Sequence, residues 1–270
     1  MKTEMVKWEY IKLIYQGGIP MFLARTSVKR SLAFALLCMA SVLLISGCSF
    51  PWRHHTSTSG ANIPKPTAQQ LLTNLQKNFR AVSSFHVVLL VQNPGPAAPD
   101  KIQIRTANGD VLLPDKVKAQ ASVMLSGQAV TVNLISVGDN QFITDPITGQ
   151  WRVIKGVLDP RTLTNPDTGL VSLISKIQHV STPVSDIANN VPCWRVTGQL
   201  AAKNLAFFTG DGVPDGTMLQ TNACIGKTDS LPYQVIVTGQ AAPGDTTQTA
   251  YNFAMSNYNE SLSINAPALQ

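Results

Sequence analysis

Two neighbouring segments, residues 117–125 and 130–135, alternate between apolar and polar side chains, and a Ser126-Gly127-Gln128 turn separates them. The apolar positions of the two segments are Ala119, Ala121, Val123, Leu125, Val130, Val132 and Leu134. Successive side chains of a strand point to opposite faces of a sheet, so this pattern predicts an antiparallel hairpin. One face of that hairpin is polar and solvated, and the apolar face must be covered by other parts of the chain.

Other segments of the sequence predict further strands and three helices. The first helix is expected after a Thr67 N-cap, with apolar residues at three- and four-residue spacing up to Val82. A second helix is expected over 169–178 and a short one over 201–208. The remaining strands are expected at 85–91, 101–106, 141–144, 151–154, 193–199, 219–225, 233–238, 249–256 and 261–264.

The order of these elements predicts the fold class. Residues 67–268 contain no internal repeat and no long low-complexity linker, so we expect one domain there. Many strands with few helices predict an α+β domain, in which a large antiparallel sheet has helices packed on one face.

The N-terminus carries the features of a targeting segment. Residues 32–45 are uncharged and apolar, follow Arg25, Lys29 and Arg30, and are shorter than the roughly 20 apolar residues of a spanning helix. Residues 1–47 are therefore predicted to be a signal peptide, whose positive region begins naturally at Met21. The tetrapeptide Ile45-Ser46-Gly47-Cys48 resembles the bacterial lipobox, which implies that Cys48 becomes diacylglycerated and begins the mature chain. The alternative is a signal anchor with an incidental cysteine.

The segment after Cys48 is polar and rich in Ser, Thr, Pro and Gly. Residues 48–66 therefore predict a lipidated cysteine followed by a flexible tether, and a lipid-anchored location on the extracytoplasmic face of the cell membrane. The formal charge of +6 is concentrated in the signal, because residues 1–47 hold six of the 21 Lys and Arg but two of the 15 Asp and Glu. The rest of the chain has no basic stripe, which argues against nucleic-acid binding.

Two cysteines, Cys193 and Cys224, remain after processing. An even number of cysteines in an exported domain favours a disulfide, with two free buried thiols as the alternative. The sequence contains no Gly-x-Ser-x-Gly elbow, His-Glu-x-x-His motif or phosphate-binding Gly-Lys-Ser/Thr loop. We therefore expect no catalytic residues, no metal site, no cofactor and no enzymatic activity.

Several motifs resemble one family of cell-envelope lipoproteins. The run Asn165-Pro166-Asp167-Thr168-Gly169-Leu170 before an apolar helix, Ser83-Ser84-Phe85-His86-Val87 and Ser256-Asn257-Tyr258-Asn259-Glu260 resemble the LppX/LprA/LprF/LprG lipoproteins. The likeness covers about residues 48–266. The chain departs from the family in an insertion at Asn204–Gly226, in Cys193 and Cys224, and in a Pro-rich loop at 93–100.

The resemblance implies a LolA/LppX-like half-barrel with helices on its concave face and an apolar cavity between the layers. Such a cavity holds the acyl chains of a membrane lipid or glycolipid, often alongside a membrane exporter. From the residues alone, a filled core and a cavity both remain open. The expected cavity residues are Val87, Leu89, Ala121, Val123, Leu125, Val130, Val132, Leu134, Leu170, Leu173 and Ile174. The alternatives are an envelope adaptor or sensor of the same fold without a lipid cargo, and an exported hydrolase.

Overall fold

The fold is described from a computed structural model. It covers residues 64–96, 103–125, 127–154, 169, 172–210 and 212–269, all within one unit of the chain, Ser59–Gln270. The predicted signal peptide, Cys48, most of the tether and Leu170 lie outside these residues.

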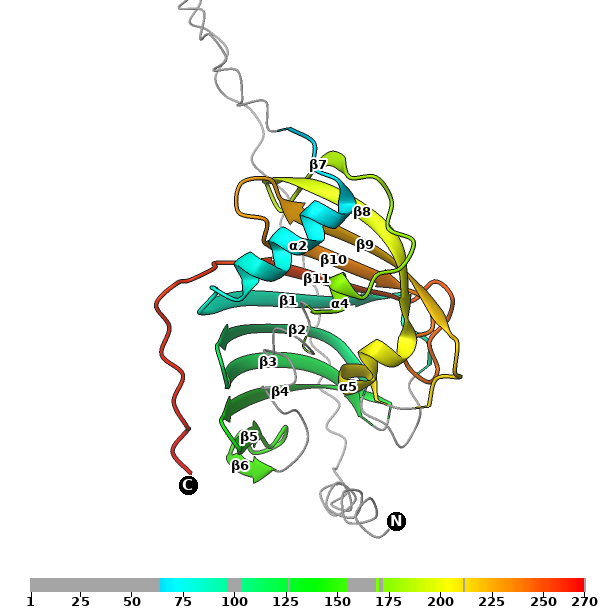
Figure 1. Cartoon of the computed structure of the whole chain (residues 1–270). Coiled ribbons are helices and arrows are strands. Elements are labelled where there is room, and N and C mark those ends of the chain that lie inside the picture. The colour runs from blue at the N-terminus through cyan, green and yellow to red at the C-terminus, as the bar shows by residue number, and fades with distance from the viewer. Residues whose placement is uncertain are drawn as a thin grey trace, which may run out of the picture. The chain divides into compact units, whose positions relative to one another are not determined.

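An eleven-stranded sheet in the order β6-β5-β4-β3-β2-β1-β11-β10-β9-β8-β7 dominates the described structure (Figure 1). All neighbouring strands are antiparallel. The chain runs from the centre to one edge (β1 to β6), and then returns from the other edge to the centre (β7 to β11). The strands are β1 Ser84–Gln92, β2 Gln103–Leu112, β3 Lys116–Leu125, β4 Gln128–Val137, β5 Asn140–Thr144, β6 Trp151–Ile154, β7 Val184–Ala188, β8 Val191–Ala201, β9 Met218–Gly226, β10 Pro232–Thr238 and β11 Ala250–Ser256.

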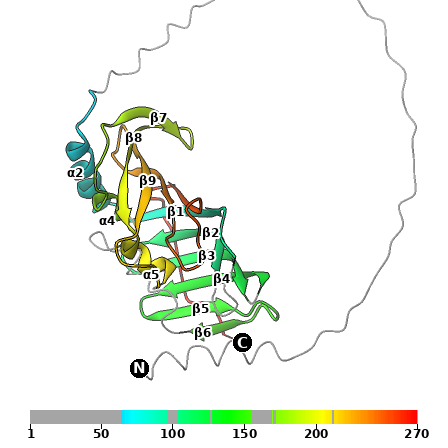
Figure 2. The ribbon, with the colours of Figure 1, turned by 90° about the vertical axis from the view of Figure 1, so that its right-hand side faces the viewer.

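The helices among the described residues lie on one side of this sheet, which bends around them as a half-barrel (Figure 2). They are α2 Ala68–Phe79, α4 Ser172–Ser175, the 3-10 helix η1 Ala202–Leu205 and α5 Ala206–Thr209. We call this side the concave face and the opposite side the convex face. The predicted fold class is therefore confirmed.

Helix α2 begins where its sequence predicts. The Thr67 hydroxyl accepts a hydrogen bond from the Gln70 amide at 3.2 Å, and the Gln70 side chain accepts one from the Thr67 amide at 2.9 Å. This capping box satisfies two amides that a helix start leaves unpaired. The apolar side of α2 buries Leu71, Leu75 and Phe79.

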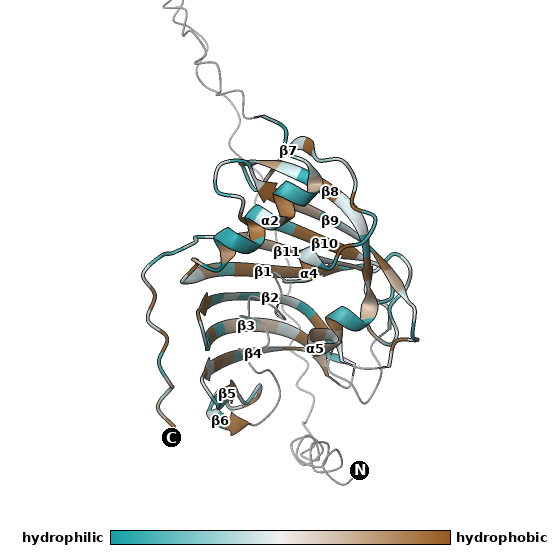
Figure 3. Cartoon of the chain, viewed as in Figure 1, coloured by the Kyte–Doolittle hydropathy of each residue, from teal (hydrophilic) through white to brown (hydrophobic). Residues whose placement is uncertain are grey.

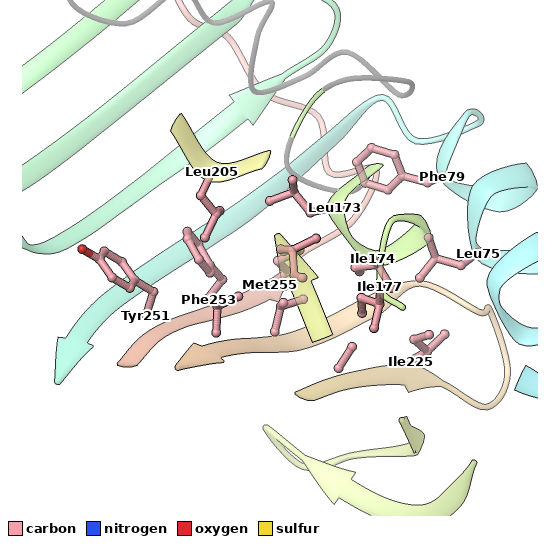
Figure 4. Close-up of a cluster of buried hydrophobic side chains, with 14 of the residues drawn as sticks. Leu75, Phe79, Leu173, Ile174, Ile177, Leu205, Ile225, Tyr251, Phe253 and Met255 are labelled. Carbon is pink, nitrogen blue, oxygen red and sulfur yellow. The ribbon is translucent and has the colours of Figure 1, made fainter. Parts of the chain in front are cut away.

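The main core lies between the helices and the strands β8–β11 and β1 (Figure 4). Leu75 and Phe79 from α2 and Ile174 from α4 are at most 2% exposed, as are Ile225 and Met255 from the sheet. Burying one such side chain typically contributes about 1.5–3 kcal/mol. This half of the concave face is therefore a filled core.

A smaller core lies on the convex face, where Ile264 covers Ile135 and Phe142. The predicted strand at 261–264 is wrong, because no strand forms there. Asn257 and Asn259 have positive φ angles of 54° and 61°, a conformation that Asn tolerates and that turns the chain out of the sheet after β11. Ile264 is nevertheless 3% exposed, since it packs across the sheet without joining it.

Strand β2 is longer than predicted. The strand predicted at 101–106 continues to Leu112. Gly109 serves a close approach between strands: a Cβ at this position would lie 2.6 Å from the Ala119 Cβ.

Two elements of the second half of the chain differ from the predictions. The helix expected at 169–178 is reduced, among described residues, to α4, because Gln178 pairs with Gln199 of β8. Strand β7 was not predicted. The helix predicted at 201–208 and the strand predicted at 219–225 form as η1 with α5 and as β9, and they account for most of the segment Asn204–Gly226.

Cys193 and Cys224 meet in a disulfide between β8 and β9, with their Cα atoms 5.6 Å apart. Both cysteines are fully buried, beside Ala188 of β7. The disulfide therefore links β8, which lies next to the edge strand β7, to its inner neighbour β9.

The segment after α4 packs closely on β8, which yields a first prediction. A Cβ at Gly198 would lie 2.3 Å from Ile177 Cγ2 and 2.6 Å from the Gln178 carbonyl oxygen. We expect Gly198→Ala to lower the free energy of unfolding by about 2 kcal/mol, because the neighbour in the way is partly backbone. Chemical denaturation measures this, with the exposed neighbour Thr197→Ala as the control. Equal midpoints for the two variants would show that the segment is not packed this closely.

The disulfide yields a second prediction. The bridged residues are 31 apart in the sequence, so reduction should lower the free energy of unfolding by roughly 3–4 kcal/mol. Denaturation with and without reductant measures the change, and non-reducing peptide mapping should recover the two cysteine peptides linked. Quantitative alkylation of both thiols in the unreduced, unfolded protein would contradict the pairing.

Candidate functional site

The concave side of β1–β4 is a continuous apolar face. The pairing register aligns Leu89, Ala107, Ala121 and Val132 in one row across the four strands. Val87, Gly109, Ala119 and Leu134 form the next row. Leu89 belongs to the main core under the helices, so both rows face the concave side.

The centre of this face is built from the smallest side chains. Ala107, Gly109, Ala119 and Ala121 form a floor, with larger aliphatic residues on β1 and β4 to either side. We call these eight residues of the two rows the trough. Because Gly109 and Ala119 already touch, no larger side chain fits between β2 and β3 there.

Most side chains of the trough are more exposed to solvent than those of the main core, to which Leu89 also belongs. Ala107, Ala119, Ala121, Val132 and Leu134 are all partly exposed, whereas the residues under α2 and α4 are buried. In Figure 3, hydrophobic and hydrophilic residues alternate along β2, β3 and β4, so the polar positions lie on the other face. An apolar surface left partly open on the inner side of a sheet is typical of a binding site.

The predicted cavity residues fall into two groups. All eight sheet residues of the prediction lie on the concave face, as the alternation indicated. Leu89, Leu173 and Ile174, however, are at most 3% exposed and belong to the filled core. A filled core therefore lies under α2 and α4, and the partly exposed trough lies beside it, mainly on β2–β4.

Sequence reasoning missed Ala107, Gly109 and Ala119 as site residues. Ala119 was on the predicted apolar face, but the other two lay beyond the predicted strand end at residue 106. A register shift between Ile104 and Thr106 also interrupts the alternation, so the sequence of β2 lacks the pattern of one continuous strand. The signal available in the sequence was the alternation of Ala107, Gly109 and Val111 after that shift.

A buried carboxyl lies where β11 begins. Asp245 Oδ2 accepts hydrogen bonds from the amides of Ala241 and Ala242, at 3.2 and 2.8 Å, and from the Tyr251 hydroxyl at 2.9 Å. Burial raises the pKa of Asp245 despite these bonds and the nearby Arg105 charge. Burial also raises the pKa of Tyr251, whose hydroxyl points away from Phe253 at the border of the core (Figure 4).

Two hollows are lined by described residues, and the second shares Leu89 and Ala107 with the trough. One, of about 430 Å³, lies beside the start of α2. The other, of about 400 Å³, lies over the central strands and is formed mainly from the convex side. Its lining residues are Val88, Leu89, Leu90, Thr106, Ala107, Asn108, Gln120, Ser122 and Thr131. This second hollow, which we call the convex hollow, combines the apolar side chains of Val88 and Leu90 with polar ones and is a rival location for a ligand.

Two histidines, His86 and His179, lie in the described part of the chain. His86 Nδ1 lies 2.7 Å from Asp110 Oδ1 across β1 and β2. His179 follows the turn after α4 with a positive φ of 52°. In the part of the chain that the structure describes, no three His, Cys, Asp or Glu side chains gather as metal ligands. Within the same residues, none of the helices has the length and apolar character needed to cross a membrane.

Comparison with known proteins relates the chain to bacterial lipoproteins. The lipoarabinomannan carrier protein LprG of Mycobacterium tuberculosis is 23% identical over 185 residues, which is 66% of this chain and 74% of that protein. LprG of Mycolicibacterium smegmatis is 24% identical over 195 residues, with coverages of 68% and 78%.

Two solved structures share the fold. LprF from Mycobacterium bovis superimposes with a TM-score of 0.59 at 18% identity and covers 76% of this chain and 100% of its own. LppX from Mycobacterium tuberculosis gives a TM-score of 0.52 at 15% identity, with coverages of 74% and 100%. The LppX_LprAFG lipoprotein family model matches residues 67–264, which spans nearly the whole described sheet. The family predicted from the sequence motifs is therefore confirmed, and this chain belongs to the LppX_LprAFG lipoproteins.

Proposed function

We propose that this protein binds the acyl chains of a membrane lipid or glycolipid on the trough and carries or retains that lipid in the cell envelope. The observation that carries the proposal is the partly exposed apolar face of β2–β4, on the inner side of a half-barrel. Its relatives are named as carriers of lipoarabinomannan, which is consistent with a lipid or glycolipid cargo here.

The small floor of the trough suits an acyl chain. Alanine and glycine side chains let a methylene chain lie close to the backbone of β2 and β3, between the walls made by Val87, Leu89, Val132 and Leu134. Each buried methylene contributes roughly 0.8 kcal/mol, so about ten methylenes contribute about 8 kcal/mol before the costs of binding. Hydrophobic burial of the acyl chain would thus be the main favourable contribution to binding.

The proposal includes a membrane anchor at Cys48. One acyl chain gives only marginal membrane binding, whereas the two chains of a diacylglyceryl group hold a protein stably. The domain would then remain on the extracytoplasmic face of the cell membrane, within reach of lipids and of a membrane exporter. Membership of a lipoprotein family supports this anchor.

The trough yields a third prediction. A bulky ring at Val132 occupies the space of an acyl chain, so Val132→Trp should reduce co-purified lipid at least fivefold, with a denaturation midpoint near that of the parent. Thr131→Trp is the matched control, because Thr131 is the next residue of β4 and is exposed on the convex side. Mass spectrometry of organic extracts measures the lipid.

The same pair of variants discriminates between sites. Lipid loss in Thr131→Trp but not in Val132→Trp would indicate that the ligand binds in the convex hollow, which Thr131 lines, and not on the trough. No lipid on the parent protein, together with a large midpoint drop in Val132→Trp, would favour an adaptor or sensor without cargo.

The anchor yields a fourth prediction. Cys48→Ser should abolish incorporation of a metabolically supplied fatty-acid analogue, because the serine hydroxyl does not replace the thiol as acyl acceptor. The variant should accumulate as a precursor or be released from the membrane. Undiminished label on Cys48→Ser would contradict the anchor assignment.

A further inference from the structure

Arg105 of β2 is a partly buried arginine whose side chain forms no hydrogen bond and no ion pair with the described residues. Two other arginines of the sheet are paired, Arg152 with Asp145 and Arg195 with Asp186. Withdrawing a charge from water without a bonded partner is unfavourable. Because Arg105 is only partly buried, an anion from outside the chain can reach its guanidinium.

A β-bulge sets the direction of the Arg105 side chain. The pairing with β3 shifts between Ile104 and Thr106, so Arg105 is an extra residue without a partner on β3. An extra residue of this kind bends the strand and turns its side chain to a new direction. Thr106 lines the convex hollow, whereas Ala107 belongs to the trough. Alternation along the strand from Ala107 therefore puts Arg105 on the trough side.

The groups that respond to the Arg105 charge agree with this position. Burial raises the pKa of both Asp245 and Tyr251, and the Arg105 charge opposes the rise in each case. Tyr251 pairs with Val91, and both belong to the main core on the concave face. Phe208 of α5 packs on the Tyr251 ring with their centroids 6.4 Å apart. The guanidinium therefore lies on the concave side, towards α5.

Asp245 does not occupy the donors of Arg105. Its Oδ2 accepts hydrogen bonds from the amides of Ala241 and Ala242 and from the Tyr251 hydroxyl, and its Oδ1 has no partner among the described residues. The carboxyl thus holds its own loop, and the guanidinium N–H groups remain available to a ligand.

Arg105 stands where the headgroup of a lipid on the trough would lie. From Arg105, the trough residues Ala107 and Gly109 follow at two-residue steps along β2, and Val111 beyond them is buried. The path from Arg105 to Gly109 is about 13 Å long, at roughly 3.3 Å per residue. A guanidinium binds two oxygens of a phosphate at once, and its planar shape fits that geometry. An apolar path with a cation at its partly exposed end matches an acyl lipid that carries a phosphate.

We propose that Arg105 binds the phosphate of the bound lipid, so that the trough prefers phosphate-bearing acyl lipids to neutral lipids with the same acyl chains. This inference rests on the proposed lipid-binding function. Arg105 is then a specificity-determining residue at the headgroup end of the trough.

A competition between two lipids that differ only in the phosphate tests the inference. The full-length chain, purified in detergent, is incubated with vesicles containing equal amounts of dipalmitoyl phosphatidate and dipalmitoylglycerol, and the bound lipids are quantified by mass spectrometry. The parent should retain phosphatidate in about tenfold excess, the effect of one charge-assisted hydrogen bond. Arg105→Gln should bring the ratio to about one and leave the denaturation midpoint near that of the parent, because the side chain has no bonded partner to lose.

Two further variants separate the guanidinium from charge in general. Arg105→Lys keeps the charge without the planar fork, so about a threefold excess of phosphatidate should remain. Lys118→Gln removes one positive charge from the neighbouring strand β3, at an exposed position on the convex side, and should keep the full excess.

Each other outcome overturns a specific claim. An unchanged ratio in Arg105→Gln, or a parent that binds both lipids equally, would refute phosphate recognition while leaving lipid binding intact. A loss of both lipids with a much lower midpoint in Arg105→Gln would assign Arg105 a structural role beside Asp245. Arg105-dependent binding of inorganic phosphate in calorimetry, with equal retention of the two lipids, would assign the site to a free anion. Retention of neither lipid by the parent would refute the proposed function itself.

Discussion

The pairing of β1 with β11 is the interaction on which the rest of the structure depends. It joins the first six strands to the last five at the centre of the sheet, through a register from His86–Ser256 to Gln92–Ala250. The same pairing brings Leu89 beside Phe253 and Val87 beside Met255. The main core therefore passes without interruption into the apolar face of β2–β4, and the candidate site is the partly exposed continuation of the core.

The two halves of the concave face differ because the helices cover them differently. Helices α2 and α4 place Leu75, Phe79 and Ile174 over the C-terminal strands and fill the space there. The trough residues Ala107, Ala119, Ala121, Val132 and Leu134 of β2–β4 stay partly exposed, whereas Val111, Val117 and Val123 of the same strands are buried. An exposed apolar surface normally destabilises a domain. Here the filled core under α2 and α4 stabilises the sheet, and the other half of the same sheet carries the partly exposed apolar surface.

Strand alternation predicted the face of the eight sheet residues expected to line the cavity, because the period of two is a local property of the chain. It did not predict where the strands end. Gly109 lay beyond the predicted strand end at residue 106, and the register shift near Ile104 conceals the rest of β2. The division of the concave face into a filled core and a partly exposed trough was likewise not predictable, because it depends on where α2 and α4 pack.

Photo-cross-linking is the most direct test of the claim that the β2–β4 face holds the lipid. The full-length chain is loaded with a lipid that carries a diazirine midway along one acyl chain, irradiated, digested and mapped by mass spectrometry. Cross-links should fall on trough positions, such as Ala119, Ala121 and Val132, and should decline when unlabelled lipid competes. Cross-links concentrated on convex-side positions, such as Val88, Gln120 and Thr131, would contradict the account.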